Sequence, residues 1–272
     1  MCLLRSVALL ALALVVGGCG ASGLPDAQSV ESQSQAEYDL GRDAFERRQY
    51  REALGHVEKA LGLREDNAEA CYLGAVVLLA FCAHDTGSPD CRFAEAERYV
   101  RRALEADPKM RDAQNVLGVV LVHLRRPGEA IAVLEPLAND MLYGSPEKAW
   151  GNLGWAYLEA GRVDAAIAAL RRAVAAQPLF CVGHFRLGEA YLRKGEYAAA
   201  RKAYTSALDI EKGDCPRLQD AFWGRAQALL KLGLETEARE DLARCRDVSS
   251  ETPTGRRCSN KLQVLNRERN SG

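Results

Sequence analysis

Nine cysteines and four histidines are the residues of this 272-residue sequence whose types could do chemistry. A thiol can form a disulfide, bind a metal ion or carry a lipid, and its sequence context separates these roles. The histidines are widely spaced, at His56, His84, His123 and His184. The sequence contains no Gly-rich phosphate loop, no Gly-x-Ser-x-Gly motif and no recognisable carboxylate pair. It therefore predicts no enzyme, no cofactor, no bound metal and no small-molecule substrate.

Composition narrows the class of protein. Lys and Arg total 36 and Asp and Glu total 37, for a net charge of −1, so no basic excess indicates a nucleic-acid partner. At 48% apolar and 27% charged residues the chain has the composition of a packed globular protein. Aromatic residues are few, at 7%, which favours helices over aromatic-rich strands.

The first 18 residues are predicted to be a signal peptide. Arg5 precedes ten apolar residues, Val7 to Val16, and a membrane span needs about 20. Residues 19–33 follow, rich in Ala, Ser, Gly and Gln, and we expect them to form a flexible tether.

Val16-Gly17-Gly18-Cys19 resembles a bacterial lipobox. The resemblance implies that the Cys19 thiol receives a diacylglycerol, that the chain is cut before Cys19, and that the new amino terminus is acylated, for example with palmitate. Several chains on one residue anchor a protein stably, because each buried methylene contributes about 0.8 kcal/mol. Gly20, in place of Asp, favours the outer over the inner membrane by the same resemblance. The alternative is an ordinary secretory peptide in which Cys19 is incidental.

A repeat runs through the rest of the chain. Leu-Gly pairs recur at Leu40-Gly41, Leu73-Gly74, Leu117-Gly118, Leu153-Gly154 and Leu187-Gly188. In the unit 147–180, the residues Trp150, Leu153, Gly154, Tyr157, Ala166, Leu170, Ala173 and Pro178 match the whole tetratricopeptide (TPR) signature. Small residues at positions 8 and 20 let the two helices of a repeat cross closely, and the proline ends the second helix. We predict an all-α TPR solenoid, a right-handed superhelix of about six helix-turn-helix repeats.

The predicted repeats occupy 34–67, 67–110, 111–144, 147–180, 181–214 and 219–252, followed by a C-terminal tail at 253–272. The second repeat holds an insertion at about 82–92. The third ends in an irregular bridge from Leu134 to Pro146, where Ser145 is expected to cap the next helix and Pro146 to begin it.

Export to an oxidising compartment permits disulfides. We expect Cys82 to pair with Cys91 across the insertion, Cys181 with Cys215 at equivalent edges of neighbouring repeats, and Cys245 with Cys258, which would hold the tail on the last repeat. Cys71 is left unpaired. A zinc site around Cys82, His84 and Cys91 is the alternative, but no Cys-x-x-Cys pair accompanies it.

The first helices of stacked repeats line a concave face. Ten apolar residues at groove-facing repeat positions are predicted to form a largely apolar binding groove, rimmed by charged residues such as Arg42, Glu159, Glu189, Arg193 and Lys231. They are Phe45, Leu78, Val119, Val122, Trp155, Leu158, Phe185, Leu192, Trp223 and Leu230.

The lipobox, short tether and six repeats together resemble the PilF/Tgl type of type IV pilus pilotin, and the bridge from Pro136 to Gly161 is similar to the corresponding stretch of that family. The resemblance implies an outer-membrane lipoprotein, anchored through Cys19 and facing the periplasm, whose groove binds secretin subunits and promotes their assembly for pilus biogenesis and motility. The alternative is a periplasmic TPR lipoprotein adaptor for another envelope complex, such as barrel assembly or peptidoglycan-enzyme scaffolding.

Overall fold

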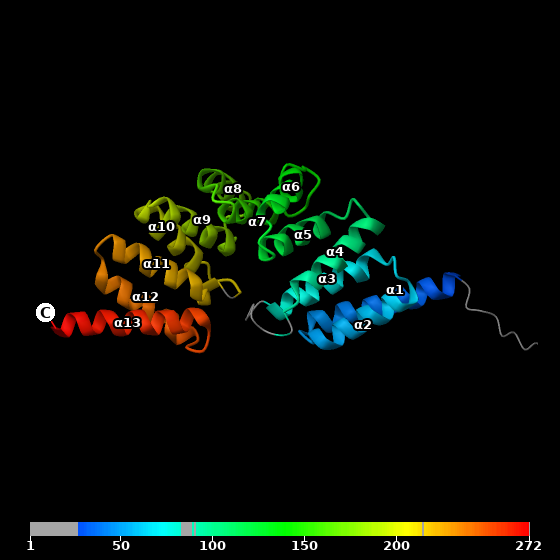
Figure 1. The fold of residues 1–272 in the computed structure, drawn as a ribbon, viewed down its shortest axis with the longest axis horizontal. Coiled ribbons are helices and arrows are strands. Elements are labelled where there is room, and N and C mark those ends of the chain that lie inside the picture. The colour runs from blue at the N-terminus through cyan, green and yellow to red at the C-terminus, as the bar shows by residue number, and fades with distance from the viewer. Residues whose placement is uncertain (1–26, 83–88, 90, 214, 272) are drawn as a thin grey trace, which may run out of the picture.

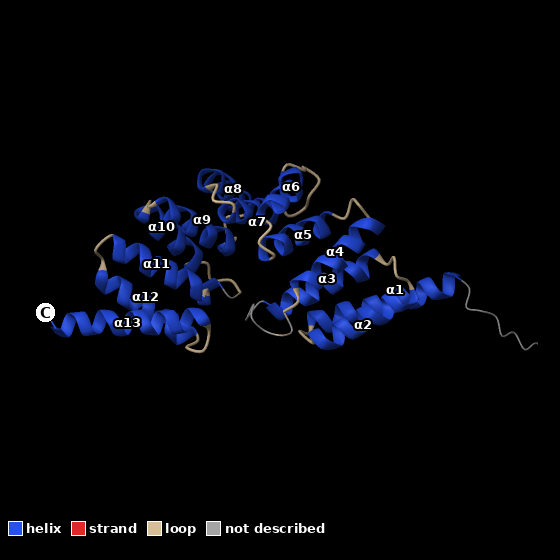
Figure 2. Cartoon of the chain, in the orientation of Figure 1, coloured by secondary structure: helices blue, strands red, loops and turns tan. Residues whose placement is uncertain are grey.

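The computed structural model describes residues 27–82, 89, 91–213 and 215–271. These residues form thirteen α-helices and one short 3-10 helix, and no strand occurs among them (Figure 2). The helices lie along an arch, with α1 and α2 at one end, α6 to α8 at its crown and α13 at the other end (Figure 1). Consecutive helices pair into antiparallel hairpins, so the predicted all-α solenoid is confirmed.

Six hairpins make up the arch. They are α1 (Ala27–Glu46) with α2 (Tyr50–Leu63), α3 (Ala68–Cys82) with α4 (Phe93–Ala106), α5 (Arg111–His123) with α6 (Pro127–Ala138), α7 (Pro146–Glu159) with α8 (Val163–Ala176), α9 (Cys181–Lys194) with α10 (Tyr197–Leu208), and α11 (Gln219–Lys231) with α12 (Glu235–Val248). The 3-10 helix η1 (Cys215–Arg217) precedes α11, and α13 (Pro253–Ser271) follows the last hairpin.

Tight turns join the two helices of a hairpin. Gly161, Gly195 and Gly233 take positive φ angles of 73°, 81° and 76° at three of these turns. Arg48 and Arg125 hold the equivalent place in the first and third hairpins at φ 60° and 61°. Glycine adopts this left-handed conformation without a steric penalty, whereas a side chain costs about 1–2 kcal/mol there. The hairpin geometry therefore overrides residue preference at the two arginines.

The helices of one hairpin cross where the Leu-Gly pairs lie. A Cβ atom added at Gly154 would stand 2.5 Å from Leu170 Cγ, and one at Gly118 would stand 2.4 Å from Leu134 Cγ. Both leucines are fully buried. The sequence-based explanation of the Leu-Gly pair, close approach of the two helices, is confirmed.

Gly154→Ala is accordingly expected to lower the free energy of unfolding by about 1–3 kcal/mol, the usual cost of overpacking a core. Gly55→Ala in α2 is the matched control, because nothing lies within 4 Å of its added Cβ. That control is expected to raise stability by about 0.5–1 kcal/mol, because alanine suits a helix interior better than glycine. Urea unfolding followed by circular dichroism measures both, and equal effects would contradict close packing at Gly154.

The first helix begins earlier than predicted, since residues 27–33 belong to α1 and not to a flexible tether. Contacts to the next helices explain the difference. The buried Ser34 hydroxyl donates to the Ala60 carbonyl at 2.9 Å and accepts from Asn67 Nδ2 at 2.9 Å. One turn earlier, Glu31 pairs with Arg64 at 2.8 Å. These tertiary contacts hold a stretch whose composition alone indicates a tether.

The bridge and the tail also contain more helix than predicted. Leu134 to Ala138 continue α6 through Pro136, so the irregular bridge is confined to residues 139–145. Pro146 begins α7 as predicted, whereas the Ser145 side chain forms no capping hydrogen bond. The predicted tail forms α13, which packs on α11 and α12 and buries Cys258 and Leu265. Just before its start, the Thr252 hydroxyl donates to Gln219 Oε1 of α11 at 2.5 Å, and Gln219 in turn donates to the carbonyls of Cys245 and Ser249 at the end of α12 at 2.6 Å.

All three predicted disulfides are present: Cys82–Cys91, Cys181–Cys215 and Cys245–Cys258. The first takes both thiols of the alternative zinc site, and His84 lies outside the described residues. Cys71 is free, as predicted. It is also buried, and burial raises the pKa of its thiol. Cys71 is therefore expected to be unreactive.

Candidate protein-binding groove

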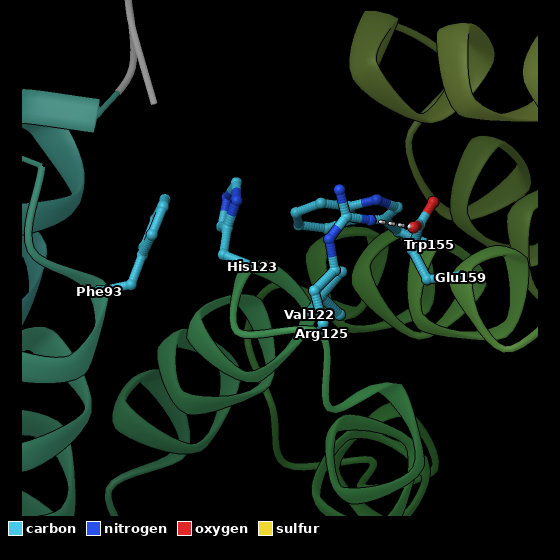
Figure 3. Close-up of a pocket in the computed structure, with 6 residues that line it drawn as sticks. All are labelled: Phe93, Val122, His123, Arg125, Trp155 and Glu159. Carbon is cyan, nitrogen blue, oxygen red and sulfur yellow. Dashed lines mark hydrogen bonds and ion pairs between the residues drawn. The ribbon is translucent and has the colours of Figure 1, made fainter. Parts of the chain in front are cut away.

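An aromatic row forms the first part of the groove (Figure 3). Phe93 begins α4, His123 ends α5 and Trp155 lies in α7. The rings of Phe93 and His123 stack with centroids 4.2 Å apart, and His123 meets Trp155 edge-on at 4.9 Å. A cavity of about 410 Å³ opens beside them, lined also by Val122, Arg125 and Glu159. Three successive repeats thus contribute rings to one surface.

A second cavity, of about 390 Å³, continues from Trp155 toward the C-terminal repeats. Phe185 of α9 and Trp223 of α11 line it, and the ring centroids of Phe185 and the buried Tyr204 are 6.1 Å apart. Because Trp155 lines both cavities, they form one groove across the second to sixth repeats. We call it the Trp155 groove.

A buried polar chain holds the floor of the groove. Asn152 of α7 donates to Asn115 Oδ1 of α5 at 2.9 Å and accepts from Arg186 of α9 at 2.7 Å. The Arg186 guanidinium lies 4.6 Å from the centroid of the Trp155 ring, a cation–π contact. These contacts link the first helices of three repeats, so the orientation of Trp155 is set by both neighbouring repeats.

Glu159 ties the same three repeats together at the edge of the groove. Its carboxylate accepts from Arg125 at 3.0 Å and from Arg193 at 2.9 Å. Arg193 also donates to the Leu158 carbonyl at 2.7 Å. Exposed pairs of this kind stabilise a fold weakly, by about 0–1 kcal/mol each, so we assign them to positioning the groove rather than to holding the solenoid together.

Two groups in the groove have displaced pKa values. Burial, assisted by the charges of Arg186 and Arg125, lowers the pKa of His123 to about 4, so its ring is neutral at pH 7. Burial raises the pKa of the Glu189 carboxyl to about 7, against the opposing effects of Arg186 and Arg193. Glu189 is therefore about half ionised at neutral pH.

The structure places the ten predicted groove residues in three settings. Trp155, Phe185, Leu192 and Trp223 line the second cavity, and Val122 lines the first although it is nearly buried. Phe45, Val119 and Leu230 are half-buried and line neither cavity.

The groove prediction was wrong for Leu78 and Leu158. They are buried in the core at 0% and 1% exposure, so they do not line a groove. The first helices of consecutive repeats contact one another, and that contact covers some of the side chains at the repeat positions expected to face the groove. Repeat position alone therefore does not separate a groove side chain from a packing one.

The groove is also less apolar than predicted. Arg186, Glu189, Asp220, Gln227 and Arg257 line the second cavity among its aromatic rings. Of the charged and polar lining residues, Glu189 and Arg193 were predicted to lie on the rim, whereas Arg186, Asp220, Gln227 and Arg257 were not predicted. Phe93 and Tyr204 lie in second helices, and Arg257 comes from α13, which the repeat pattern does not cover.

The described residues offer no other evident chemistry. No group of three or more potential metal ligands comes together among them. Within the same part of the chain, no helix has the length and apolar character to cross a membrane. Cys19 and its lipobox lie outside the described residues.

The repeats of this chain match a known protein family. A tetratricopeptide repeat profile matches residues 38–85, 92–140, 137–179, 152–214 and 185–246. The chain belongs to the tetratricopeptide repeat family. Members of such repeat families present extended concave surfaces for binding, as the Trp155 groove does here.

Relatives by sequence are similar over one part of this TPR protein. Superkiller complex protein 3 of Mus musculus is 30% identical to this chain, and that of Homo sapiens is 32% identical, each over 110 residues. The match covers 40% of this chain and 7% of each relative's length.

Two solved structures are similar over most of the TPR protein. PilW, described as a widely conserved type IV pilus biogenesis factor, superposes with a TM-score of 0.68 at 23% identity, covering 85% of this chain and 97% of its own. Pseudomonas aeruginosa pilF superposes with a TM-score of 0.64 at 17% identity, covering 85% and 99%. At these identities the likeness establishes a shared fold.

Proposed function

We propose that this TPR protein is a lipid-anchored pilotin of the outer membrane, which binds secretin subunits in the Trp155 groove and promotes their assembly for type IV pilus biogenesis. The observation that carries the proposal is the structural match to PilW, which covers 85% of this chain and 97% of that pilus biogenesis factor. A match over almost a whole chain supports a shared role more strongly than a match of one or two common repeats.

The lipobox supports the proposed location. Cys19 precedes the first residue of α1, Ala27, by eight residues. A fully extended chain of that length reaches about 28 Å. The repeats would therefore work close to the inner surface of the outer membrane, where secretin subunits must arrive.

The groove supports the proposed activity. An unassembled secretin subunit exposes apolar surface that its own ring will later cover, and such surface aggregates when it stays open to water. Trp155, Phe185 and Trp223 offer aromatic area held in place by neighbouring repeats. A rigid aromatic surface binds a partner segment at a low cost in conformational entropy.

The experiment is deletion and rescue in the source organism. We expect deletion to abolish heat-resistant secretin multimers in the outer membrane, while secretin monomer persists, and a plasmid copy to restore them. Site-specific photo-crosslinking from the groove, with the probe at Gln227, should then capture the secretin subunit. A probe at Glu240 on α12, outside the Trp155 groove, is the control. Normal multimers after deletion, or crosslinks to an envelope protein other than a secretin, would instead favour the adaptor role.

A further inference from the structure

The second cavity of the Trp155 groove contains a carboxylate with no partner in the described structure. Glu189 of α9 lines this cavity, and no hydrogen bond or ion pair joins it to a described residue. No fully buried side-chain oxygen or nitrogen lacks a hydrogen bond in that part of the chain. The carboxyl oxygens of Glu189 therefore open into the cavity.

The other charged groups around this cavity are held by contacts of their own. Arg193 is paired with Glu159 at 2.9 Å. Arg186 donates to Asn152 and to the Gly151 carbonyl, and it stacks on the Trp155 ring. Asp220 of α11 accepts from Thr254 at 2.6 Å.

Two further groups complete the surroundings of Glu189. Arg257 of α13 is exposed, so water and salt screen its charge. Tyr204 of α10 is neutral at physiological pH, because burial raises the pKa of its hydroxyl. Glu189 is thus left as the carboxylate that still has room for a partner.

Aromatic rings make the rest of this cavity suitable for a cation. Phe185 lies one helical turn before Glu189 on α9, and Trp223 faces the same cavity from α11. The π faces of such rings attract ammonium and guanidinium groups and disfavour anions. A carboxylate that shares a cavity with aromatic rings is a chemical arrangement that recognises a basic side chain with an apolar stem.

We propose that the cavity between α9 and α11 binds a lysine or arginine side chain of the bound partner segment, with Glu189 as its counter-ion and the rings of Phe185 and Trp223 as its walls. Identifying that segment as part of a secretin rests on the proposed function above. The basic side chain fixes the register of an otherwise apolar segment in the groove, because a charge without its partner there is costly.

Because Glu189 titrates near neutral pH, the proposal predicts the direction in which the affinity for the partner changes with pH. Near pH 6 the carboxyl is mostly protonated, because burial raises its pKa to about 7. A bound cation favours the ionised form and lowers that pKa, so binding releases a proton and affinity rises with pH. If the pKa falls by about two units on binding, the affinity is roughly tenfold higher at pH 8 than at pH 6. A bound anion would reverse both signs.

The probes are three synthetic 12-residue apolar peptides that differ at one central position, which holds lysine, norleucine or glutamate. They are titrated into the mature lipoprotein in detergent at pH 6 and pH 8, followed by tryptophan fluorescence and by calorimetry in two buffers of different ionisation enthalpy. We expect the lysine peptide to bind about tenfold more tightly than the norleucine peptide at pH 8, and its binding at pH 6 to release a proton.

Glu189→Gln should remove the lysine preference and the pH dependence. Glu211→Gln, which neutralises an exposed charge outside the cavity, should preserve both. Tighter binding of the glutamate peptide, proton uptake, or equal affinity for all three peptides would overturn the proposal.

A parallel titration with the purified, unassembled secretin subunit separates this inference from the proposed function. If the lysine preference holds and the subunit does not bind, the secretin role is wrong and the cavity chemistry stands. If the subunit binds and Glu189→Gln changes neither its affinity nor its pH profile, the cavity chemistry is wrong and the secretin role stands.

Discussion

Replacing Cys19 with alanine is expected to move the protein from the outer-membrane fraction to the soluble periplasmic fraction and to abolish heat-resistant secretin multimers. The thiol that accepts the diacylglycerol is lost, and with it a contribution of about 0.8 kcal/mol for each methylene that the acyl chains would bury. Membrane fractionation and unheated gel electrophoresis of the secretin measure the two effects.

Cys2→Ser is the matched control, because Cys2 lies in the segment predicted to be removed. We expect this variant to behave as the wild type. Normal multimers in a Cys19→Ala strain whose protein is fully soluble would contradict a role for the anchor in secretin assembly. Retention of Cys19→Ala protein in the outer membrane would contradict the lipobox interpretation itself.

Replacing Trp155 and Phe185 together with glutamate is expected to weaken secretin binding by at least about 30-fold, which corresponds to about 2 kcal/mol and is typical of central aromatic residues in an interface. Both side chains are half-buried in the groove, and the new carboxylates would place charge on its aromatic surface. Binding to the purified secretin subunit is measured by surface plasmon resonance.

The control tests an exposed apolar residue outside the groove. Met141 in the bridge between α6 and α7 is 98% exposed, so Met141→Glu removes an apolar side chain far more open than those of the groove. We expect Met141→Glu to bind secretin normally, with circular dichroism showing that all variants remain folded. Loss of binding with Met141→Glu, and normal binding by the groove variant, would relocate the interface to the bridge.

Local spacing was enough to predict the repeat architecture. In an otherwise apolar helix, a glycine such as Gly118 or Gly154 indicates that another helix approaches closely at that point. Because the same offsets recur along the chain, one repeat predicts the others. One disulfide follows from the same periodicity, which brings Cys181 and Cys215 to equivalent edges of adjacent units.

Contacts between distant segments decided the ends of the solenoid. The stretch that includes Glu31 and Ser34 is polar, and its composition indicates a tether until Arg64 and Asn67 are placed beside it. Likewise α13 has little repeat character, and it is held by the hydrogen bond from Thr254 to Asp220 of α11 and by the Cys245–Cys258 disulfide. A helix stabilised by tertiary contacts leaves a weak local signal, since packing outweighs intrinsic propensity.

The sequence by itself determined the fold, the number of repeats and the three disulfides, because each depends on residues at recognisable spacings along the chain, whereas the lipobox stays a prediction. The tertiary structure decided the chemistry of the groove. Leu158 is equivalent in repeat position to Leu192, yet the first is buried in the core and the second faces the cavity. The same structure places Glu189 in one cavity with aromatic rings from α7, α9, α10 and α11 and with Arg257 of α13. The burial of a groove side chain and the charges around it depend on all the surrounding helices together, so they are set only when those helices have packed in the folded solenoid.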